Sequence, residues 1–282
     1  MVSSLAATMP QLSDSQANAS PANSSQANAP QASPTEWSGR YADKDSLRSQ
    51  VWATLKAQKA VRRDPVGHIP NFIGADLAAE QLAALSIWQQ AQVVKCNPDS
   101  PQKSVRLRAL QDGKTLYMAV PRLTRKKCFV ELTAEALAAK GISLETAATM
   151  RNALIYGRLV SFEEMLPIDL VVTGCVAVSP NGGRTGKGAG FADLELAMMA
   201  QFDLVQPATP IVTTVHSLQV VENDLLPMQP HDWPLDWAIT PEAAIETQTP
   251  YSRPAGLDWE AIQPEQYRQI PILRSLRPAP MS

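Results

Sequence analysis

The sequence of 282 residues predicts an α/β fold, on two observations about its apolar residues. Short runs rich in apolar and β-branched residues have the length and composition of strands, and they lie at 91–96, 115–120, 129–132, 170–178, 210–221 and 235–239. Segments with helical periodicity alternate with these runs, which is typical of a parallel sheet. The run at 170–178 is predominantly apolar, as in a strand covered on both faces. The predicted architecture is therefore a Rossmann-like, three-layer fold whose mostly parallel sheet has helices on both faces.

The first helix is expected over 43–61, where Leu47, Val51 and Leu55 recur every four residues and would form a buried stripe. Asp43 or Asp45 can cap its start. Lys44 and Arg48 also lie four residues apart and share one face of this helix, either as a solvated basic face or as part of a site. Further helices are expected at 76–90, 105–111, 133–140 and from about residue 191.

Residues 1–37 are predicted to be a disordered, low-complexity tail, and residues 38–282 a single α/β domain. The tail consists mainly of Ser, Ala, Asn, Gln and Pro, and 15–24 is nearly repeated at 25–34. Such a segment buries too little apolar surface to offset its conformational entropy. The proline-rich stretch at 249–282 is expected to be mostly irregular and to pack through Leu257, Trp259 and Ile262.

Composition and charge exclude several classes of protein. A net charge of −2 gives no general electrostatic signature of nucleic-acid binding. No window approaches the roughly 18 apolar residues of a membrane span. Three cysteines without paired spacing, Cys96, Cys128 and Cys175, suit buried thiols in a reducing compartment. Because a secretory or organelle signal is also missing from the pattern, we expect a cytoplasmic monomer with neither a membrane nor a nucleic-acid partner.

The candidate site is a glycine-rich turn at 179–190, between the strand at 170–178 and a helix beginning near Phe191. Arg184 and Lys187 add positive charge, and the helix start directs N–H groups at the same turn. The spacing excludes both a Walker A loop and a dinucleotide G-x-G-x-x-G motif. On these residues alone, a flexible linker and a phosphate-binding loop both remain open. Residues without a Cβ would let the backbone approach an anion, and three alternate here: Gly186, Gly188 and Gly190.

Two histidines and a basic region complete the candidates. The pair His231 and Asp232 lies in the loop before the strand at 235–239, where it would shape a ligand crevice or only stabilise a turn. His68 lies in a loop with nothing nearby to activate it. The cations from Arg106 to Lys127 suggest RNA binding, a solvated loop or an edge of the anion site, although exposed aromatic residues do not interleave them.

Taken in order, these motifs resemble the 5-formyltetrahydrofolate cyclo-ligases, also called methenyltetrahydrofolate synthetases, over about 44–246. The chain has Lys-x-x-Leu-Arg at 44–48 and Asp-Leu-Val-Val at 169–172. Its loop at 183–193 is similar to the family pattern G-x-R-L-G-x-G-x-G-Y-Y-D, and 226–240 resembles L-P-x-x-x-H-D followed by D-x-I-x-T. The segment at 186–195 is most similar to a divergent branch, the methenyltetrahydrofolate synthetase domain-containing proteins.

The resemblance implies an ATP-dependent reaction that converts 5-formyltetrahydrofolate to 5,10-methenyltetrahydrofolate through a phosphorylated formyl group. It implies ATP and Mg²⁺ as cofactors and a reduced folate as substrate. Asp193 would ligate Mg²⁺, Arg184 and Lys187 would act in catalysis, and Phe191 and His231 would contact the substrate. The residues implied to bind ATP are Lys44, Arg48, Arg184, Gly186, Lys187, Gly188, Gly190 and Asp193.

Some positions depart from the family pattern. Ala189 stands where the family has a cation, Ala192 where it has the second of two tyrosines, and Leu194 where it has arginine. The glutamate of the family's E-x-x-T segment has no convincing counterpart near 102–106. The alternative hypothesis is therefore a catalytically lapsed module of the same fold that still binds nucleotide or folate.

Overall fold

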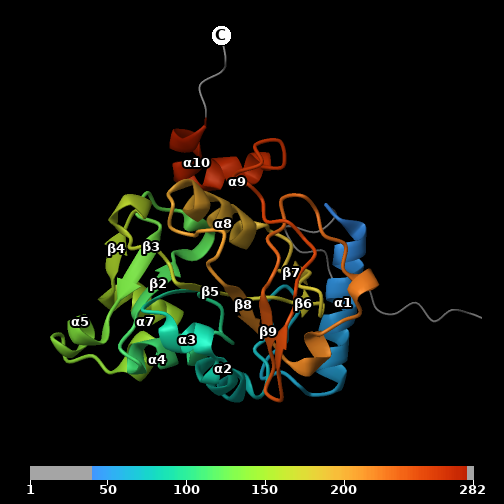
Figure 1. Cartoon of the computed structure of the whole chain (residues 1–282), viewed down its shortest axis with the longest axis horizontal. Helices are drawn as coiled ribbons and strands as arrows, with labels where there is room; N and C mark the ends of the chain where they lie inside the picture. The colour runs from blue at the N-terminus through green and yellow to red at the C-terminus, as the bar shows by residue number, and fades with distance from the viewer. Residues whose placement is uncertain (1–39, 278–282) are drawn as a thin grey trace, which may run out of the picture. The chain divides into compact units, whose positions relative to one another are not determined.

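The structure is a computed structural model that describes residues 40–277 (Figure 1). Its main sheet has the strand order β10-β9-β8-β5-β1-β2-β3-β4. The five strands from β9 to β2 are parallel, and antiparallel pairings add β10 at one edge and β3 and β4 at the other. Their bounds are β1 Val93–Cys96, β2 Thr115–Ala119, β3 Phe129–Leu132, β4 Arg158–Val160, β5 Leu170–Thr173, β8 Ile211–Thr214, β9 Trp237–Ile239 and β10 Ala244–Glu246.

Helices connect and cover these strands. The α-helices are α1 Ala42–Ala57, α2 Ala75–Ala84, α3 Ser86–Gln90, α4 Lys103–Gln111, α5 Ala134–Ala138, α6 Leu144–Ala147, α7 Met150–Tyr156, α8 Phe191–Gln201, α9 Pro264–Gln269 and α10 Pro271–Leu276. Short 3₁₀ turns are η1 Pro121–Leu123, η2 Phe162–Glu164, η3 Ser217–Gln219 and η4 Asn223–Leu225.

Helices lie on both faces of the sheet, as predicted (Figure 1). Alternate residues of each strand point to opposite faces, so each strand contributes to two cores. On one face, Val171 of β5 packs with Leu196 of α8 and Leu273 of α10. On the other, Val172 packs with Leu82 of α2 and other residues of α2 to α7. The predicted three-layer α/β architecture is confirmed.

Helix α1 packs beside this sheet on a separate two-stranded hairpin, which is formed by β6 Ala177–Val178 and β7 Arg184–Thr185. The predicted stripe of Leu47, Val51 and Leu55 is buried, and it packs against Ala177 and Leu226. The helix ends at Ala57, before the predicted end at 61. Lys59 adopts a positive φ of 53°, and the Ala60 N–H bonds to the Leu55 carbonyl, so the chain turns there.

Three predicted elements are divided in the structure. The run at 170–178 is not one strand, because the chain leaves the sheet at Gly174, where a Cβ would meet Gln102 Oε1 at 2.9 Å. The helix at 76–90 breaks at Leu85, whose ψ of 145° is extended. The strand at 210–221 ends at Thr214, and His216 Nδ1 then caps the turn η3 by accepting from the Leu218 N–H at 3.1 Å.

The described part of the proline-rich stretch, 249–277, is mostly irregular as predicted, and it contains the short helices α9 and α10. Of the three residues predicted to pack, Leu257 and Ile262 contact the core on the α8 side, whereas Trp259 is half-buried and is not among the residues of that core. All three cysteines are buried thiols, also as predicted, and burial raises the pKa of Cys96 to about 11 and that of Cys128 to about 12.

The predicted disorder of residues 1–37 lies outside the described residues. Across residues 40–277, the helices are too short or too polar to cross a bilayer. A cytoplasmic location and a monomeric state stay predictions.

Candidate functional site

A cavity of about 1170 Å³ opens at the carboxyl ends of the parallel strands, where open α/β sheets bind ligands. Its walls come from α1, the loop after β1, the turn η1, the glycine-rich loop and the start of α8. The structure brings every predicted site residue to this one cavity: Lys44, Arg48, Arg184, Gly186, Lys187, Gly188, Gly190, Phe191, Asp193 and His231. Their individual roles stay predictions.

The glycine-rich loop leads from the hairpin strand β7 into α8. Gly190 has a φ of 69° and occupies the N-cap position, so the loop turns sharply into the helix. At Gly186 a Cβ would meet no other atom within 4 Å. The packing within the described residues therefore gives no reason for glycine at 186, whereas close approach of a ligand would give one.

Arg184 is buried, with 2% of its surface exposed, and its Nε and Nη2 atoms donate to protein groups. Its guanidinium pairs with Asp193 and donates from Nε to the Trp233 carbonyl at 2.7 Å. Asp193 also accepts from the Trp233 N–H at 2.9 Å. Burial raises the pKa of Asp193, and the charge of Arg184 opposes that rise. Arg184 therefore fixes the loop onto α8 and onto the segment at Trp233.

Two cations of α1, Lys44 and Arg48, are also buried and paired. Lys44 pairs with Asp232, whose carboxylate in turn accepts from the Gln229 N–H at 2.6 Å. Arg48 pairs with Asp45 and donates to Thr185 Oγ1 of β7 at 2.7 Å. The four-residue spacing seen in the sequence thus places two cations on the cavity side of α1, where each holds a neighbouring segment.

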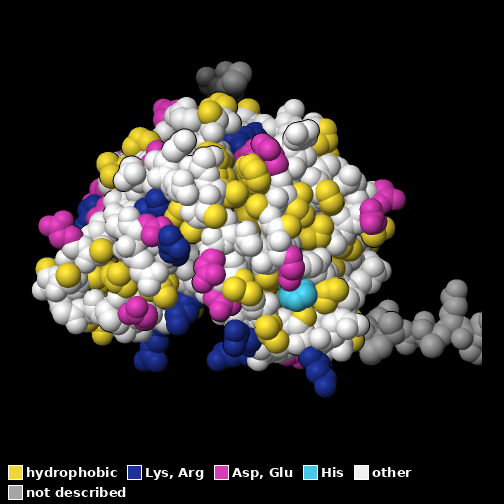
Figure 2. All heavy atoms as spheres, turned by 60° about the horizontal axis from the view of Figure 1, so that its bottom comes forward, with side chains coloured by type: hydrophobic (Ala, Val, Ile, Leu, Met, Phe, Trp, Pro, Cys, Tyr) yellow, Lys and Arg dark blue, Asp and Glu magenta, His cyan; other side chains and the backbone are white. Residues whose placement is uncertain are grey.

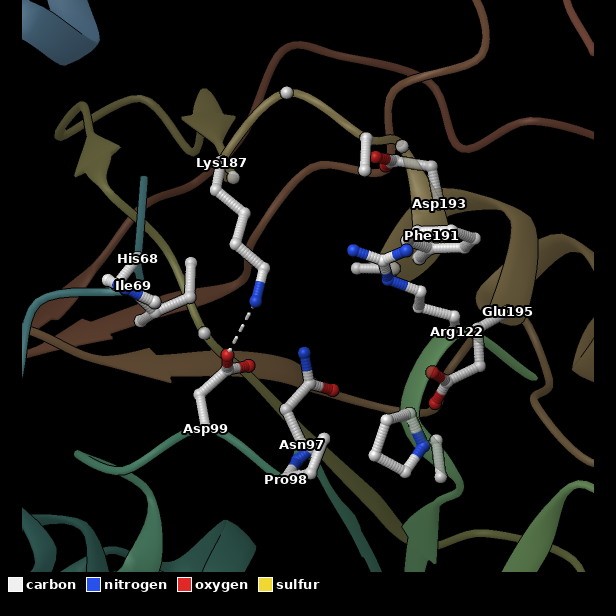
Figure 3. A pocket seen from close by; sticks show the side chains of 18 of the residues that line it. His68, Ile69, Asn97, Pro98, Asp99, Arg122, Lys187, Phe191, Asp193 and Glu195 are labelled. Carbon is white, nitrogen blue, oxygen red and sulfur yellow. Dashed lines mark hydrogen bonds and ion pairs between the residues drawn. The ribbon is translucent and has the colours of Figure 1, made fainter. Parts of the chain in front are cut away.

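Lys187 reaches across the cavity from the glycine-rich loop to Asp99 in the loop after β1 (Figure 3). The distance from Nζ to Oδ1 is 3.2 Å, and 42% of the lysine side chain is exposed. It is thus far more accessible than Lys44 and Arg48, whose side chains are each 5% exposed. Asp99 was not predicted, because it is 88 residues from Lys187 in the sequence and only the fold brings the two together.

A fully buried arginine donates hydrogen bonds to the backbone of the loop that carries Asp99. Arg106 of α4 donates to the carbonyls of Asn97, Asp99 and Ala148, the last two at 3.1 and 2.9 Å. Burial lowers its pKa. The predicted basic stretch from Arg106 to Lys127 is therefore not one solvated surface, because its first member lies in the interior and positions a cavity loop.

A buried ion pair that was not predicted lies next to the cavity, which one of its partners, Glu195, lines. Lys95, at the end of β1, pairs with Glu195 of α8 and also donates to the Asn97 side chain. Both partners are at least 96% buried, and burial raises the pKa of Glu195 against the opposing charge of Lys95. A lysine inside an otherwise apolar strand, Val-Val-Lys-Cys, was the available signal.

His231 and His68 both line the cavity. His231 Nε2 lies 3.3 Å from the hydroxyl of Tyr41, and its neighbour Asp232 is the partner of Lys44. The pair His231 and Asp232 therefore forms part of the cavity wall and does more than stabilise a turn. His68 contributes its carbonyl to the Trp52 indole N–H at 3.0 Å.

Charged side chains of both signs are interspersed on the face drawn in Figure 2. Figure 2 shows Lys and Arg groups along the lower edge of one face, on both sides of a hollow, with acidic and uncharged groups between them. Among residues 40–277, no cluster of three His, Cys, Asp or Glu side chains could hold a metal ion. The Mg²⁺ ligand predicted at Asp193 stays a prediction, and Oδ1 of this carboxylate already accepts from Arg184 and from the Trp233 N–H.

Comparison with known proteins identifies the family. Residues 40–241, more than half of the chain, match the 5-formyltetrahydrofolate cyclo-ligase family. The chain belongs to this family. It is 42% identical over 236 residues to a Bos taurus methenyltetrahydrofolate synthase domain-containing protein, and 41% identical to the Homo sapiens protein of that name. These matches cover 83% of this chain and 62% and 61% of the two relatives, so the chain spans about three fifths of their length.

A solved structure was also found. The NMR structure of Aquifex aeolicus 5,10-methenyltetrahydrofolate synthetase aligns with a TM-score of 0.47 and 18% identity, covering 74% of this chain and 95% of that one. The family expected from the ordered motifs is thus confirmed by the sequence matches. The described segment from 242 to 277 lies beyond the family match, yet Gly256, Ala261 and Gln266 of this segment line the cavity.

Proposed function

We propose that this cyclo-ligase-family chain is an ATP-dependent 5-formyltetrahydrofolate cyclo-ligase that produces 5,10-methenyltetrahydrofolate. The supporting observation is the convergence of the family's motif residues on one cavity. Its volume of about 1170 Å³ exceeds the roughly 300–1,000 Å³ of typical small-molecule pockets, which leaves room for a nucleotide beside a folate.

In this reaction the formyl oxygen attacks the γ-phosphorus of ATP and ADP leaves. The neighbouring folate nitrogen then attacks the formyl carbon and loses its proton, and phosphate departs with its electron pair. Phosphoryl transfer depends mainly on positioning and on positive charge around the phosphoryl oxygens. Lys187 would supply that charge, because it is the most exposed of the predicted cations and extends into the cavity.

The buried cations would position this site. Arg184 and Arg48 join the glycine-rich hairpin to α8 and α1, and Lys44 joins α1 to the loop at Asp232. N–H groups of the loop and the start of α8 would face the phosphates. Magnesium, when bound with the nucleotide, would neutralise phosphate charge, and Asp193 would hold it.

A second candidate is a binding module that no longer catalyses. Ala189 is buried, and its carbonyl accepts from the Gln266 side chain at 2.5 Å, so α9 occupies the surroundings of the family's cation position. Leu194 packs against the core on the α8 side in place of an arginine. These features support retention of the ligand sites with loss of phosphoryl transfer.

A single-turnover assay tests the first candidate. The full chain, in excess over 5-formyltetrahydrofolate, is mixed with ATP and Mg²⁺, and formation of the methenyl product is followed by its near-ultraviolet absorbance. We expect product with the unmodified chain and with Lys126→Met, whose lysine lies outside the cavity lining, and a large loss with Lys187→Met. An absence of product from the unmodified chain would exclude the cyclo-ligase.

Calorimetry then separates the two candidates. Titration with MgATP and then with 5-formyltetrahydrofolate reports binding without turnover. If both ligands bind and no product forms, the lapsed module is supported. The combined change Ala189→Lys, Ala192→Tyr and Leu194→Arg should then create activity, and continued inactivity of a folded, ligand-binding triple variant would count against that reading.

A further inference from the structure

Arg122 occupies a strained backbone position beside the cavity. It lies in the turn η1, directly after β2, with a φ of 59°, and Leu123 follows with a φ of 52°. Left-handed conformations are unfavourable for residues with a Cβ, and two in succession are uncommon. Such strain persists only where the surrounding structure enforces it, and it is concentrated at functional sites.

The turn is held firmly on both sides of Arg122. Leu123 is 1% exposed and belongs to the core on the α8 side. The Val120 N–H bonds to the Cys128 carbonyl at 2.8 Å, and the Leu123 N–H bonds to the Val120 carbonyl at 2.9 Å. Pro121 restricts its own φ. Because the neighbours are fixed, the left-handed backbone sets the direction in which the side chain leaves the turn.

That direction leads into the cavity. Figure 3 shows Arg122 extending from the end of β2 toward the glycine-rich loop and the start of α8, with its guanidinium near Phe191 and facing the space that Lys187 enters from the other side. The cations Lys44, Arg48 and Arg184 are buried in ion pairs with protein carboxylates. Lys187, which is paired with Asp99, and Arg122 are two cations whose side chains extend into this space.

We propose that Arg122 is a further anion-binding residue of the cavity and that its guanidinium contacts phosphate oxygens of the nucleotide at the glycine-rich loop. The inference rests on the proposed nucleotide site. It adds to that site a cation from outside the glycine-rich loop, in a chain whose loop has Ala189 at the position of the family's cation. Arginine suits this role because its planar donors match phosphate oxygens. The strained backbone would then be tolerated because it directs this side chain into the cavity.

The test compares Arg122→Gln with Arg125→Gln. Arg125 is an exposed arginine of the same segment outside the cavity lining, so both variants lose one positive charge. Calorimetry with MgATP should show about a ten- to hundred-fold weaker Kd for Arg122→Gln and little change for Arg125→Gln. Equal affinity of the unmodified chain and Arg122→Gln would overturn the inference, whereas an unmodified chain that binds no nucleotide would instead overturn the proposed function.

Two further measurements sharpen the result. Titration with 5-formyltetrahydrofolate alone should be unaffected by Arg122→Gln, and weakening confined to folate would assign the arginine to a carboxylate and overturn the phosphate contact. Arg122→Gly, which tolerates the left-handed backbone and removes the guanidinium, should also weaken MgATP binding.

Discussion

Gly186 and Gly190 differ in the reason for which the site would require glycine. Gly190 adopts a positive φ, and a Cβ there would approach the Gln266 side chain at 3.0 Å, so the fold itself favours glycine. Gly186 has open space around its Cβ position. A requirement for glycine at 186 would therefore come from a ligand, and this difference separates structural from functional glycines within one loop.

Gly186→Ala should leave the Tm within about 2 °C of the unmodified chain and weaken MgATP binding at least ten-fold, because the added methyl group would meet the phosphates and no protein atom. Thermal unfolding and calorimetry provide the two readouts. Gly190→Ala is the matched control, and it should lower the Tm. Unchanged affinity in Gly186→Ala would argue against close approach of a phosphate to this backbone.

The ion pair of Lys95 and Glu195 is buried between the parallel strand β1 and helix α8, where an unpaired charge would be costly. Removal of one partner leaves the other charge buried alone, which costs about 3–5 kcal/mol. We expect Lys95→Met and Glu195→Leu each to destabilise the chain by this amount in urea unfolding. The double variant should be less destabilised than the sum of the two, and additive effects would contradict the pairing.

At the scale of elements, one carboxylate links the three strands β2, β3 and β4 at the antiparallel edge of the sheet. Glu131 of β3 accepts two hydrogen bonds from Arg158 of β4, at 2.9 and 2.8 Å, and one from the Tyr117 hydroxyl of β2 at 3.0 Å. The hydrogen bonds from Arg158 are the main reason that the pKa of Glu131 lies below its usual value. The arrangement stabilises the edge only while the carboxylate is ionised.

This lowered pKa determines how the contribution of Glu131 to stability changes with pH. A carboxylate with a depressed folded-state pKa contributes stability above its unfolded pKa of about 4.5, and that contribution is lost as pH falls through the folded value. Glu131→Gln should therefore be less stable than the unmodified chain at pH 7, and the difference should shrink below about pH 4.5. Urea unfolding over pH 3–7 measures it. A difference that is constant with pH would refute the assignment.

At the scale of the whole molecule, segments far apart in the sequence meet at one cavity. Helix α1, the loop after β1, the turn η1, the glycine-rich loop and the segment at 256–266 all contribute to its lining. Gln266 of α9 bonds to the Ala189 carbonyl, and Arg40 bonds to the Ala261 carbonyl. A ligand bound there would contact both ends of the described chain at once.

Ligand binding should therefore stabilise the fold as a whole. MgATP at one hundred times its Kd adds about 2.7 kcal/mol, which corresponds to a rise in Tm of roughly 5–10 °C for a domain of this size. Thermal unfolding of the full chain with and without MgATP tests this. Lys187→Met should reduce the shift and Lys126→Met should not. The absence of any shift at saturating nucleotide would contradict binding at this cavity.

The sequence by itself determined the alternation of strands and helices, the buried stripe of α1, the glycine-rich loop and the family, because these depend on local periodicity and on motifs in fixed order. Only the tertiary structure decided that Arg184 is buried against Asp193, that Asp99 faces Lys187, and that Arg122 leaves a left-handed turn toward the cavity. These features depend on which strand ends lie side by side and on which charges the fold buries. Neighbours in space, rather than in sequence, set the state of each side chain.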